Sequence, residues 1–133
     1  MPLLYHNSLV TADVPRAAAF YDRVLATLGA ERLVDELPLL VAYGMPGEEA
    51  SFFIQSPDHM PFLERTTANA HFAFKATAPE EVVAFYDAAL ANGAESVLAA
   101  KVHEEIHPTY FGTVIRDLDG HMPECFVIVE AAD

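Results

Sequence analysis

The sequence predicts an α+β protein of two tandem βαβββ modules, whose curved, mainly antiparallel sheets form a cup. Three landmarks recur in one register: a histidine, an Ala-Phe-Tyr-Asp segment and a Gly-Ala-Glu segment. Their copies are His6 and His71, 19–22 and 84–87, and 29–31 and 93–95. The offsets are 65, 65 and 64 residues, which indicates a duplicated unit rather than chance. We therefore expect a first module over 1–58, a linker over 59–68 and a second module over 69–133.

The first module is expected to contain a strand, a helix and three shorter strands. Its helix should begin at Asp13, because an aspartate caps the first turn well and Pro15 suits the position that follows. Gly29 stands where a glycine in the left-handed region ends a helix. Short apolar runs between turn residues predict the strands. These strands cover 3–11, 32–37, 39–43 and 50–55.

The second module repeats this order with its own start and stop signals. The segment 77–80, Thr-Ala-Pro-Glu, fits a capping box at the start of its helix. Gly93 takes the place of Gly29, and the Asp119-Gly120 pair predicts a hairpin between the last two strands. The predicted strands cover 69–76, 96–102, 110–116 and 122–129.

Composition excludes several classes of protein. The chain has 133 residues, of which 53% are hydrophobic, so it can bury a core without disulfide bonds. It carries seven Lys and Arg against 20 Asp and Glu, a net charge of −13, which argues against binding nucleic acid or an anionic membrane. A single cysteine and the lack of an apolar run of 18 residues fit a soluble, cytoplasmic protein.

Strand alternation assigns side chains to the two faces of the second sheet. On the strand that opens the module, His71 and Lys75 alternate with Phe72 and Phe74. The phenylalanines should pack against the helix, so His71 should lie on the opposite, open face. By the repeat, His6 should lie on the corresponding face of the first sheet.

Glu124 stands in the middle of an apolar strand, where an unpaired carboxylate is costly to bury. A cation beside it would remove that cost. Glu124 with His6 and His71 would make a donor set that suits a divalent transition metal with open coordination positions. The alternative is that each histidine is structural and that the glutamate lies at an exposed edge.

These segments together resemble the vicinal oxygen chelate superfamily, which includes glyoxalases, fosfomycin-resistance enzymes, extradiol dioxygenases and bleomycin-resistance proteins. The resemblance covers nearly the whole chain. It rests on the paired strand–helix openings and on the closing Asp-x-Asp-Gly-x-x-x-Glu segment over 117–124. It implies paired βαβββ modules around one divalent ion (Fe, Mn, Zn, Ni or Co). Carried over by position, the metal ligands are His6, His71 and Glu124.

In the glyoxalases of this superfamily a fourth ligand follows the glycine of the first module's last hairpin. Counting four residues from Gly47, as Glu124 follows Gly120, gives Ser51, which is a poor metal ligand. The chain therefore looks closer to the three-ligand members. The resemblance also implies a homodimer and a small-molecule substrate.

His107 and Tyr110 are the candidate acid and base, because they precede a central strand at a point where a loop could reach the cup. A polar loop histidine and a packed tyrosine are the structural alternatives. The remaining candidates have weaker expected roles. Lys75 could attract an anionic substrate or lie at the surface, His121 should be exposed, Cys125 should be a core residue, and His59 and His103 have no expected partner.

These residues predict a metal-dependent enzyme of the lyase, isomerase or dioxygenase kind. Its substrate would chelate the ion through two adjacent oxygens. The first alternative is a metal-free binding protein that sequesters a small molecule, as bleomycin-resistance proteins do. The second is a member whose site is vestigial, with an interaction role.

Overall fold

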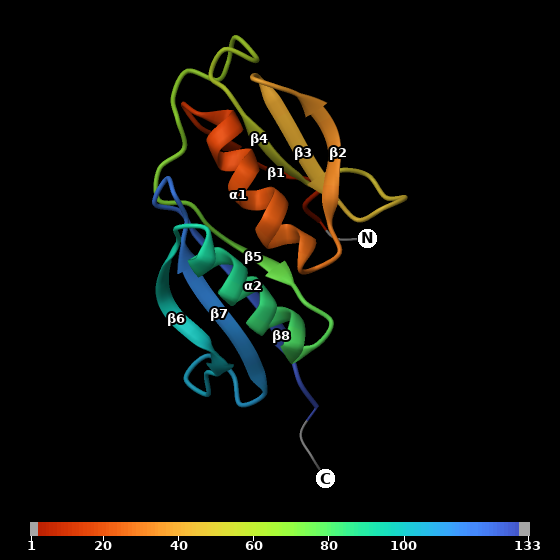
Figure 1. The fold of residues 1–133 in the computed structure, drawn as a ribbon, viewed down its shortest axis with the longest axis vertical. Helices are drawn as coiled ribbons and strands as arrows, with labels where there is room; N and C mark the ends of the chain where they lie inside the picture. The colour runs from red at the N-terminus through yellow and green to blue at the C-terminus, as the bar shows by residue number, and fades with distance from the viewer. Residues whose placement is uncertain (1–2, 131–133) are drawn as a thin grey trace. The chain divides into compact units, whose positions relative to one another are not determined.

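The computed structural model describes residues 3–130 and confirms the predicted α+β class with tandem modules. The chain forms two compact units, divided between Ala68 and Asn69. Each unit holds one helix and one four-stranded mixed sheet. The helix of each unit lies along one face of that unit's own sheet (Figure 1). Every strand thus has one face toward a helix and one face away from it, and the second is called the open face below.

The first unit contains helix α1 (Val14–Ala26) and a sheet in the order β1-β4-β3-β2. Strand β1 pairs in parallel with β4, and the other two pairs are antiparallel. The strands are β1 (Asn7–Val10), β2 (Glu31–Glu36), β3 (Leu40–Gly44) and β4 (Phe52–Gln55).

The second unit has the same plan, with helix α2 (Pro79–Ala91) and the strand order β5-β8-β7-β6. Strand β5 runs parallel to β8, and the β8–β7 and β7–β6 pairs are antiparallel. The strands are β5 (His71–Lys75), β6 (Glu95–Val102), β7 (Tyr110–Arg116) and β8 (Met122–Ile128).

The predicted start of α1 is confirmed, whereas the predicted capping box of α2 over 77–80 is wrong. Asp13 accepts a hydrogen bond from the backbone N–H of Arg16 at 3.1 Å. In α2 the N-cap is Ala78, whose side chain cannot accept a bond. The polar pair lies just outside it: the backbone N–H and hydroxyl of Thr77 donate to Glu81 Oε1 at 2.6 and 2.7 Å. This arrangement lowers the pKa of Glu81, mainly through the bond from the Thr77 backbone.

Aromatic contacts fix the helix side of each sheet. Tyr21 of α1 meets Phe52 of β4 edge to face, with ring centroids 5.0 Å apart. In the second unit the ring centroids of Phe74 of β5 and Phe85 of α2 are 6.0 Å apart. The phenylalanines of β5 therefore point toward the helix, as predicted, and His71 lies on the open face.

The opening strand is shorter than the predicted 3–11. Strand β1 begins at Asn7, whose N–H donates to the carbonyl of Ser51 just before β4 begins at Phe52. Leu3, Leu4 and Tyr5 are all exposed. The apolar run therefore continues beyond the partner strand, and a strand needs a partner for its backbone groups. His6 consequently lies one residue before β1.

No helix within 3–130 is long and apolar enough to cross a membrane.

Candidate functional site

His71 and Glu124 meet on the open face of the second sheet. The parallel pairing of β5 with β8 places Ala73 opposite Glu124 and His71 one side-chain step away on the same face. His71 Nε2 lies 3.1 Å from Glu124 Oε1. The histidine side chain is 56% exposed and the glutamate 14%, so one partner is open to solvent and the other is held in the sheet.

The second ring nitrogen of His71 determines where its proton lies. Nδ1 is 3.0 Å from the carbonyl oxygen of Met122, which can only accept, so Nδ1 carries the proton. In the neutral ring Nε2 then presents a lone pair to a carboxylate, which also only accepts. The contact is attractive when the ring carries a proton on Nε2 as well as on Nδ1, or when a cation binds both Nε2 and Glu124 Oε1.

Tyr110 holds the other oxygen of Glu124. It is the first residue of β7, and its hydroxyl donates to Glu124 Oε2 at 2.5 Å. Its ring stacks on Phe126 of β8, with centroids 5.3 Å apart and planes inclined by 16°. Burial, followed by the bond to the carboxylate, raises the pKa of Tyr110 well above its usual value. The phenol therefore stays protonated and acts as a hydrogen-bond donor at neutral pH.

The pair fits a metal site in its chemistry and in its supporting contacts. Histidine ligands usually donate their second N–H to a carbonyl or carboxylate, as His71 does, and ligating carboxylates are themselves hydrogen-bonded, as Glu124 is. Two donor atoms that each lie about 2.0–2.2 Å from one ion are about 3 Å apart. Within 3–130, no three His, Cys, Asp or Glu residues gather into a metal-binding group. The second unit thus contributes two fitting donors.

His6 belongs to the first unit, and its ring lies against Phe53 of β4 with centroids 4.7 Å apart. The register of β1 with β4 pairs Ser8 with Phe53, which puts both histidines on the open face of their sheets. His6 is an exposed residue.

The expected equivalence of Ser51 and Glu124 is wrong. Ser8 corresponds to Ala73 by the repeat, and these residues pair with Phe53 and Glu124 respectively. The count from the hairpin glycine fails because seven residues separate β3 from β4, whereas five separate β7 from β8. Phe53 is therefore the counterpart of Glu124, and a phenyl ring cannot ligate a metal.

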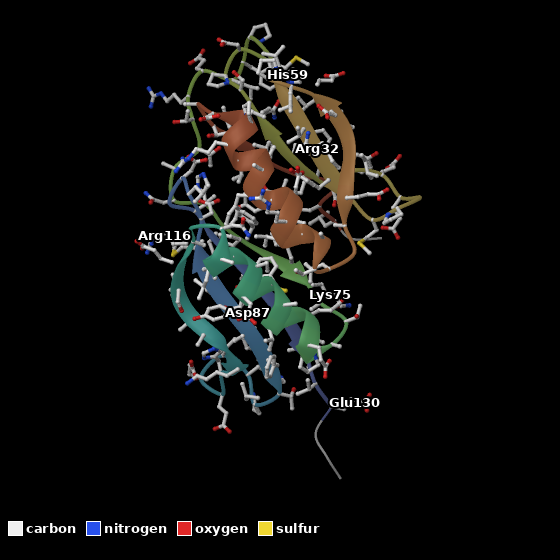
Figure 2. The ribbon with its side chains drawn as sticks, viewed as in Figure 1. Arg32, His59, Lys75, Asp87, Arg116 and Glu130 are labelled. Atoms are coloured by element: carbon white, nitrogen blue, oxygen red, sulfur yellow. The ribbon has the colours of Figure 1, made fainter. Side chains whose placement is uncertain are left out.

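His107 lies in the loop between β6 and β7, as predicted, and is exposed. Its Nδ1 accepts the backbone N–H of Thr109 at 3.2 Å, so its Nε2 carries the proton and faces outward. Lys75 ends β5 and is exposed (Figure 2). Its pairing with Phe126 places it on the same open face as His71.

His103, for which no partner was expected, is buried and anchors this loop. Its Nε2 lies 2.7 Å from the carbonyl of Ala99 and its Nδ1 lies 3.2 Å from Glu105 Oε1. The two contacts tie the ring to β6 on one side and to the 103–109 loop on the other. Its ring also contacts Tyr110 edge to face at 6.2 Å. His59 likewise has a partner, Gln55, whose side-chain oxygen lies 2.8 Å from its Nδ1.

The predicted exposure of His121 is wrong, because its side chain is buried. Its Nδ1 accepts the backbone N–H of Ala70 at 3.1 Å, which ties the start of β5 to the hairpin before β8. Cys125 is a buried core residue, as predicted. Burial, followed by the nearby charges of Glu81 and Glu124, raises the pKa of its thiol to about 12.

Gly112 and Phe126 were not identified from the sequence as parts of the site. Alternation along β8 already placed Phe126 on the face of Glu124, so a signal for it existed. Gly112 pairs with Phe126, and its role depends on the path of the Tyr110 ring, which no spacing rule gives.

The sequence model of the glyoxalase/bleomycin resistance protein/dioxygenase superfamily matches residues 3–124. No curated protein matches the chain in sequence. Among solved structures, a glyoxalase/bleomycin resistance protein from Albidiferax ferrireducens T118 is 22% identical with a TM-score of 0.76, covering 94% of this chain and 98% of its own. A lactoylglutathione lyase from Agrobacterium tumefaciens is 19% identical with a TM-score of 0.66, covering 95% and 93%. TioX from Micromonospora sp. ML1 is 15% identical with a TM-score of 0.68, covering 96% and 100%.

Proposed function

Because this chain belongs to the glyoxalase/bleomycin resistance protein/dioxygenase superfamily, we propose that it is a metal-dependent enzyme of the lyase, isomerase or extradiol dioxygenase type. Its substrate is a small molecule with two adjacent oxygens. The observation that carries the proposal is the approach of His71 Nε2 to Glu124 Oε1 at 3.1 Å, with both outer contacts of a ligand pair in place.

The ligands in this proposal are His71 and Glu124 of the second unit and His6 of the first. A divalent ion, when bound, supplies Lewis-acid stabilisation of negative charge on a substrate oxygen. The protein's own contribution is orientation: the Met122 carbonyl fixes the His71 ring, and the Tyr110 hydroxyl fixes the carboxylate of Glu124.

Proton transfer is assigned to His107 rather than to Tyr110. The outward Nε2–H of His107 can donate to a substrate oxygen, since its Nδ1 is occupied by the N–H of Thr109. Tyr110 was also expected to act as acid or base. Its raised pKa keeps the phenol protonated, so no phenolate is available to act as a base, and its proton is already donated to Glu124. In this proposal Tyr110 therefore positions the carboxylate.

The proposal includes a homodimer in the cytoplasm. Members of the superfamily often dimerise and bind small molecules, and the acidic charge of −13 does not favour nucleic acid or anionic lipid. Light scattering coupled to size-exclusion chromatography should give twice the 14.5 kDa chain mass. A mass of one chain would contradict the dimer and leave the metal site to its own test.

A metal-free binding protein is the second candidate, and two observations favour it. A proton on His71 Nε2 is enough to make the contact with Glu124 Oε1 a hydrogen bond, without a metal ion. Phe126, which is half-buried and stacks on Tyr110, also offers an apolar surface next to this contact against which a small molecule could pack.

Metal content per chain, measured by inductively coupled plasma mass spectrometry, separates the two candidates. We expect near-stoichiometric metal in the wild type and almost none in Glu124→Gln, which keeps the size of the side chain and removes its charge. Glu104→Gln, an exposed change in the 103–109 loop, is the matched control and should keep its metal. A wild-type protein that lacks metal and does not take up added Mn²⁺, Fe²⁺, Co²⁺, Ni²⁺ or Zn²⁺ would support the metal-free candidate.

A further inference from the structure

Gly112 lies under the ring of Tyr110, in the middle of β7. The two residues share the open face, and the Tyr110 side chain extends along its own strand over Gly112. A Cβ atom added at Gly112 would come within 2.4 Å of Tyr110 Cζ and within 2.5 Å of its hydroxyl oxygen. Carbon atoms in contact stay about 3.5–4.0 Å apart, so no side chain fits there while the ring keeps its place.

The place of the ring decides what Glu124 can do. From its position over Gly112 the Tyr110 hydroxyl reaches Glu124 Oε2 at 2.5 Å. The remaining oxygen, Oε1, then faces His71 Nε2. Glu124 is opposite Val114 rather than opposite Tyr110 in the β7–β8 register, so the hydroxyl must cross the space above Gly112 to reach it.

We propose that Gly112 is a positioning residue of the metal site: its missing side chain lets Tyr110 reach Glu124 and leave one carboxylate oxygen directed at His71. The inference rests on the proposed function for its metal-binding consequence. The underlying contacts, Gly112 to Tyr110 to Glu124 to His71, also exist without a metal and can be tested separately.

Three variants test this chain of contacts. Tyr110→Phe removes only the hydroxyl. Gly112→Ala displaces the ring. The double variant Tyr110→Ala with Gly112→Ala removes the clash and the hydroxyl together. Gly44→Ala is the control for a glycine clash outside the site: a Cβ atom added at Gly44 would come within 2.8 Å of the Glu49 carbonyl oxygen and of Leu33 Cδ1, but Gly44 belongs to the first unit.

Binding of Co²⁺ by its visible absorbance, at fixed pH, is the main measurement, and thermal unfolding is followed in parallel. Tyr110→Phe and Gly112→Ala should each weaken Co²⁺ binding about 10–100-fold, the usual cost of losing an outer-sphere partner. Measured against Tyr110→Ala alone, the double variant should lose less melting temperature than Gly112→Ala loses against the wild type, because no ring is left for the added methyl to displace, and its Co²⁺ affinity should stay weak. Gly44→Ala should lose stability but keep its affinity. Wild-type affinity in Gly112→Ala, or an equal cost of Gly112→Ala in the presence and absence of the Tyr110 ring, would overturn the inference.

A metal-free measurement distinguishes failure of this inference from failure of the proposed function. The side-chain ¹⁵N signals of His71 at fixed pH should shift in the same way in Tyr110→Phe and Gly112→Ala and stay unchanged in Gly44→Ala. If the wild type binds no Co²⁺ while these shifts occur, the metal function fails and the positioning role stands. If Co²⁺ binds and the His71 signals are the same in the wild type, Tyr110→Phe and Gly112→Ala, the positioning role fails and the metal function stands. Should Gly112→Ala not fold, Tyr110→Phe and the double variant still carry the test.

Discussion

The two units share one topology and differ in what fills their open faces. Both begin with a histidine that lies against the last strand of its own sheet. In the second unit that strand offers Glu124, whereas in the first it offers Phe53 at the same register position. The neighbouring positions on the same face differ as well. Gly112 pairs with Phe126 in the second unit, and the corresponding residue of the first unit is Leu40, which pairs with Gln55.

This difference shows that a repeated fold does not by itself repeat the chemistry. The same backbone supports a carboxylate held by a tyrosine in one unit and a phenyl ring under an imidazole in the other. Only the second unit combines a charged acceptor, a donor that orients it and the space that this donor needs. The first unit contributes a histidine whose ring is supported by an apolar contact.

Removing each histidine in turn should have the largest effect. His71→Ala and His6→Ala should both weaken Co²⁺ binding by more than the roughly 100-fold that an outer-sphere partner can cost, because each removes a proposed ligand. Isothermal titration calorimetry measures the affinities, and His59→Ala is the histidine control from the first unit. If His6→Ala bound Co²⁺ with wild-type affinity, His6 would not be a metal ligand. The third ligand to the ion would then be a group other than His6.

Making the first unit resemble the second should have the next largest effect. Phe53→Glu places a carboxylate beside His6 at the position that Glu124 has beside His71. We expect about tenfold tighter Co²⁺ binding, equivalent to about 1.4 kcal/mol. Phe53→Gln, which has nearly the same size without the charge, should not tighten it. Equal affinities in both variants would show that position 53 does not contribute to the ion's site.

The fold was largely predictable, because the repeat and the strand period constrain it directly. Strand 110–116 was predicted with its observed bounds, and Asp13 caps α1 as expected. The first strand was predicted too long, because an apolar run in sequence does not show where its partner strand begins. His121 was expected to be exposed because it flanks a turn. It is buried because its ring accepts the N–H of Ala70, which is a long-range contact.

The site was predictable only as far as alternation reaches. Period two placed His71 and Glu124 on the sides of their strands that face away from the helix, but their contact also needs the parallel pairing of β5 with β8, which alternation does not give. The equivalence of Ser51 failed because it was counted through loops, whose lengths differ between the units. The contact of Tyr110 with Glu124 depends on a side-chain rotamer and on the space at Gly112, and neither is encoded in spacing.

The cores of the two units should respond differently to alkaline pH. Cys125 stands where the first unit has Ile54, and both are buried. The pKa of the Cys125 thiol is about 12 in the folded state and 9.0 in the unfolded state. The protonated thiol therefore contributes its full stabilisation below pH 9, and this contribution is lost as the pH rises from 9 toward 12. At pH 10 the loss is about 1.4 kcal/mol.

Urea unfolding at pH 8 and pH 10 measures this effect. The wild type should lose more stability than Cys125→Ala, in which the titrating thiol is absent and other groups are unchanged. An equal loss in both proteins would show that Cys125 does not titrate in this range.

The buried hydroxyl of Tyr43 should have the smallest effect and belongs to the first unit alone. It lies between Asp22 Oδ1 at 2.7 Å and the carbonyl of Ala18 at 3.0 Å, and its register counterpart in the second unit is Ile115. Tyr43→Phe should lower the free energy of unfolding by about 1 kcal/mol, because Arg32 still pairs with Asp22 at 2.6 Å and limits the cost. Tyr86→Phe, which loses an exposed bond to Ser96, should change it by less than about 0.5 kcal/mol. Equal urea midpoints for the two variants would mean that the Tyr43 hydroxyl contributes no more to stability than an exposed hydrogen bond does.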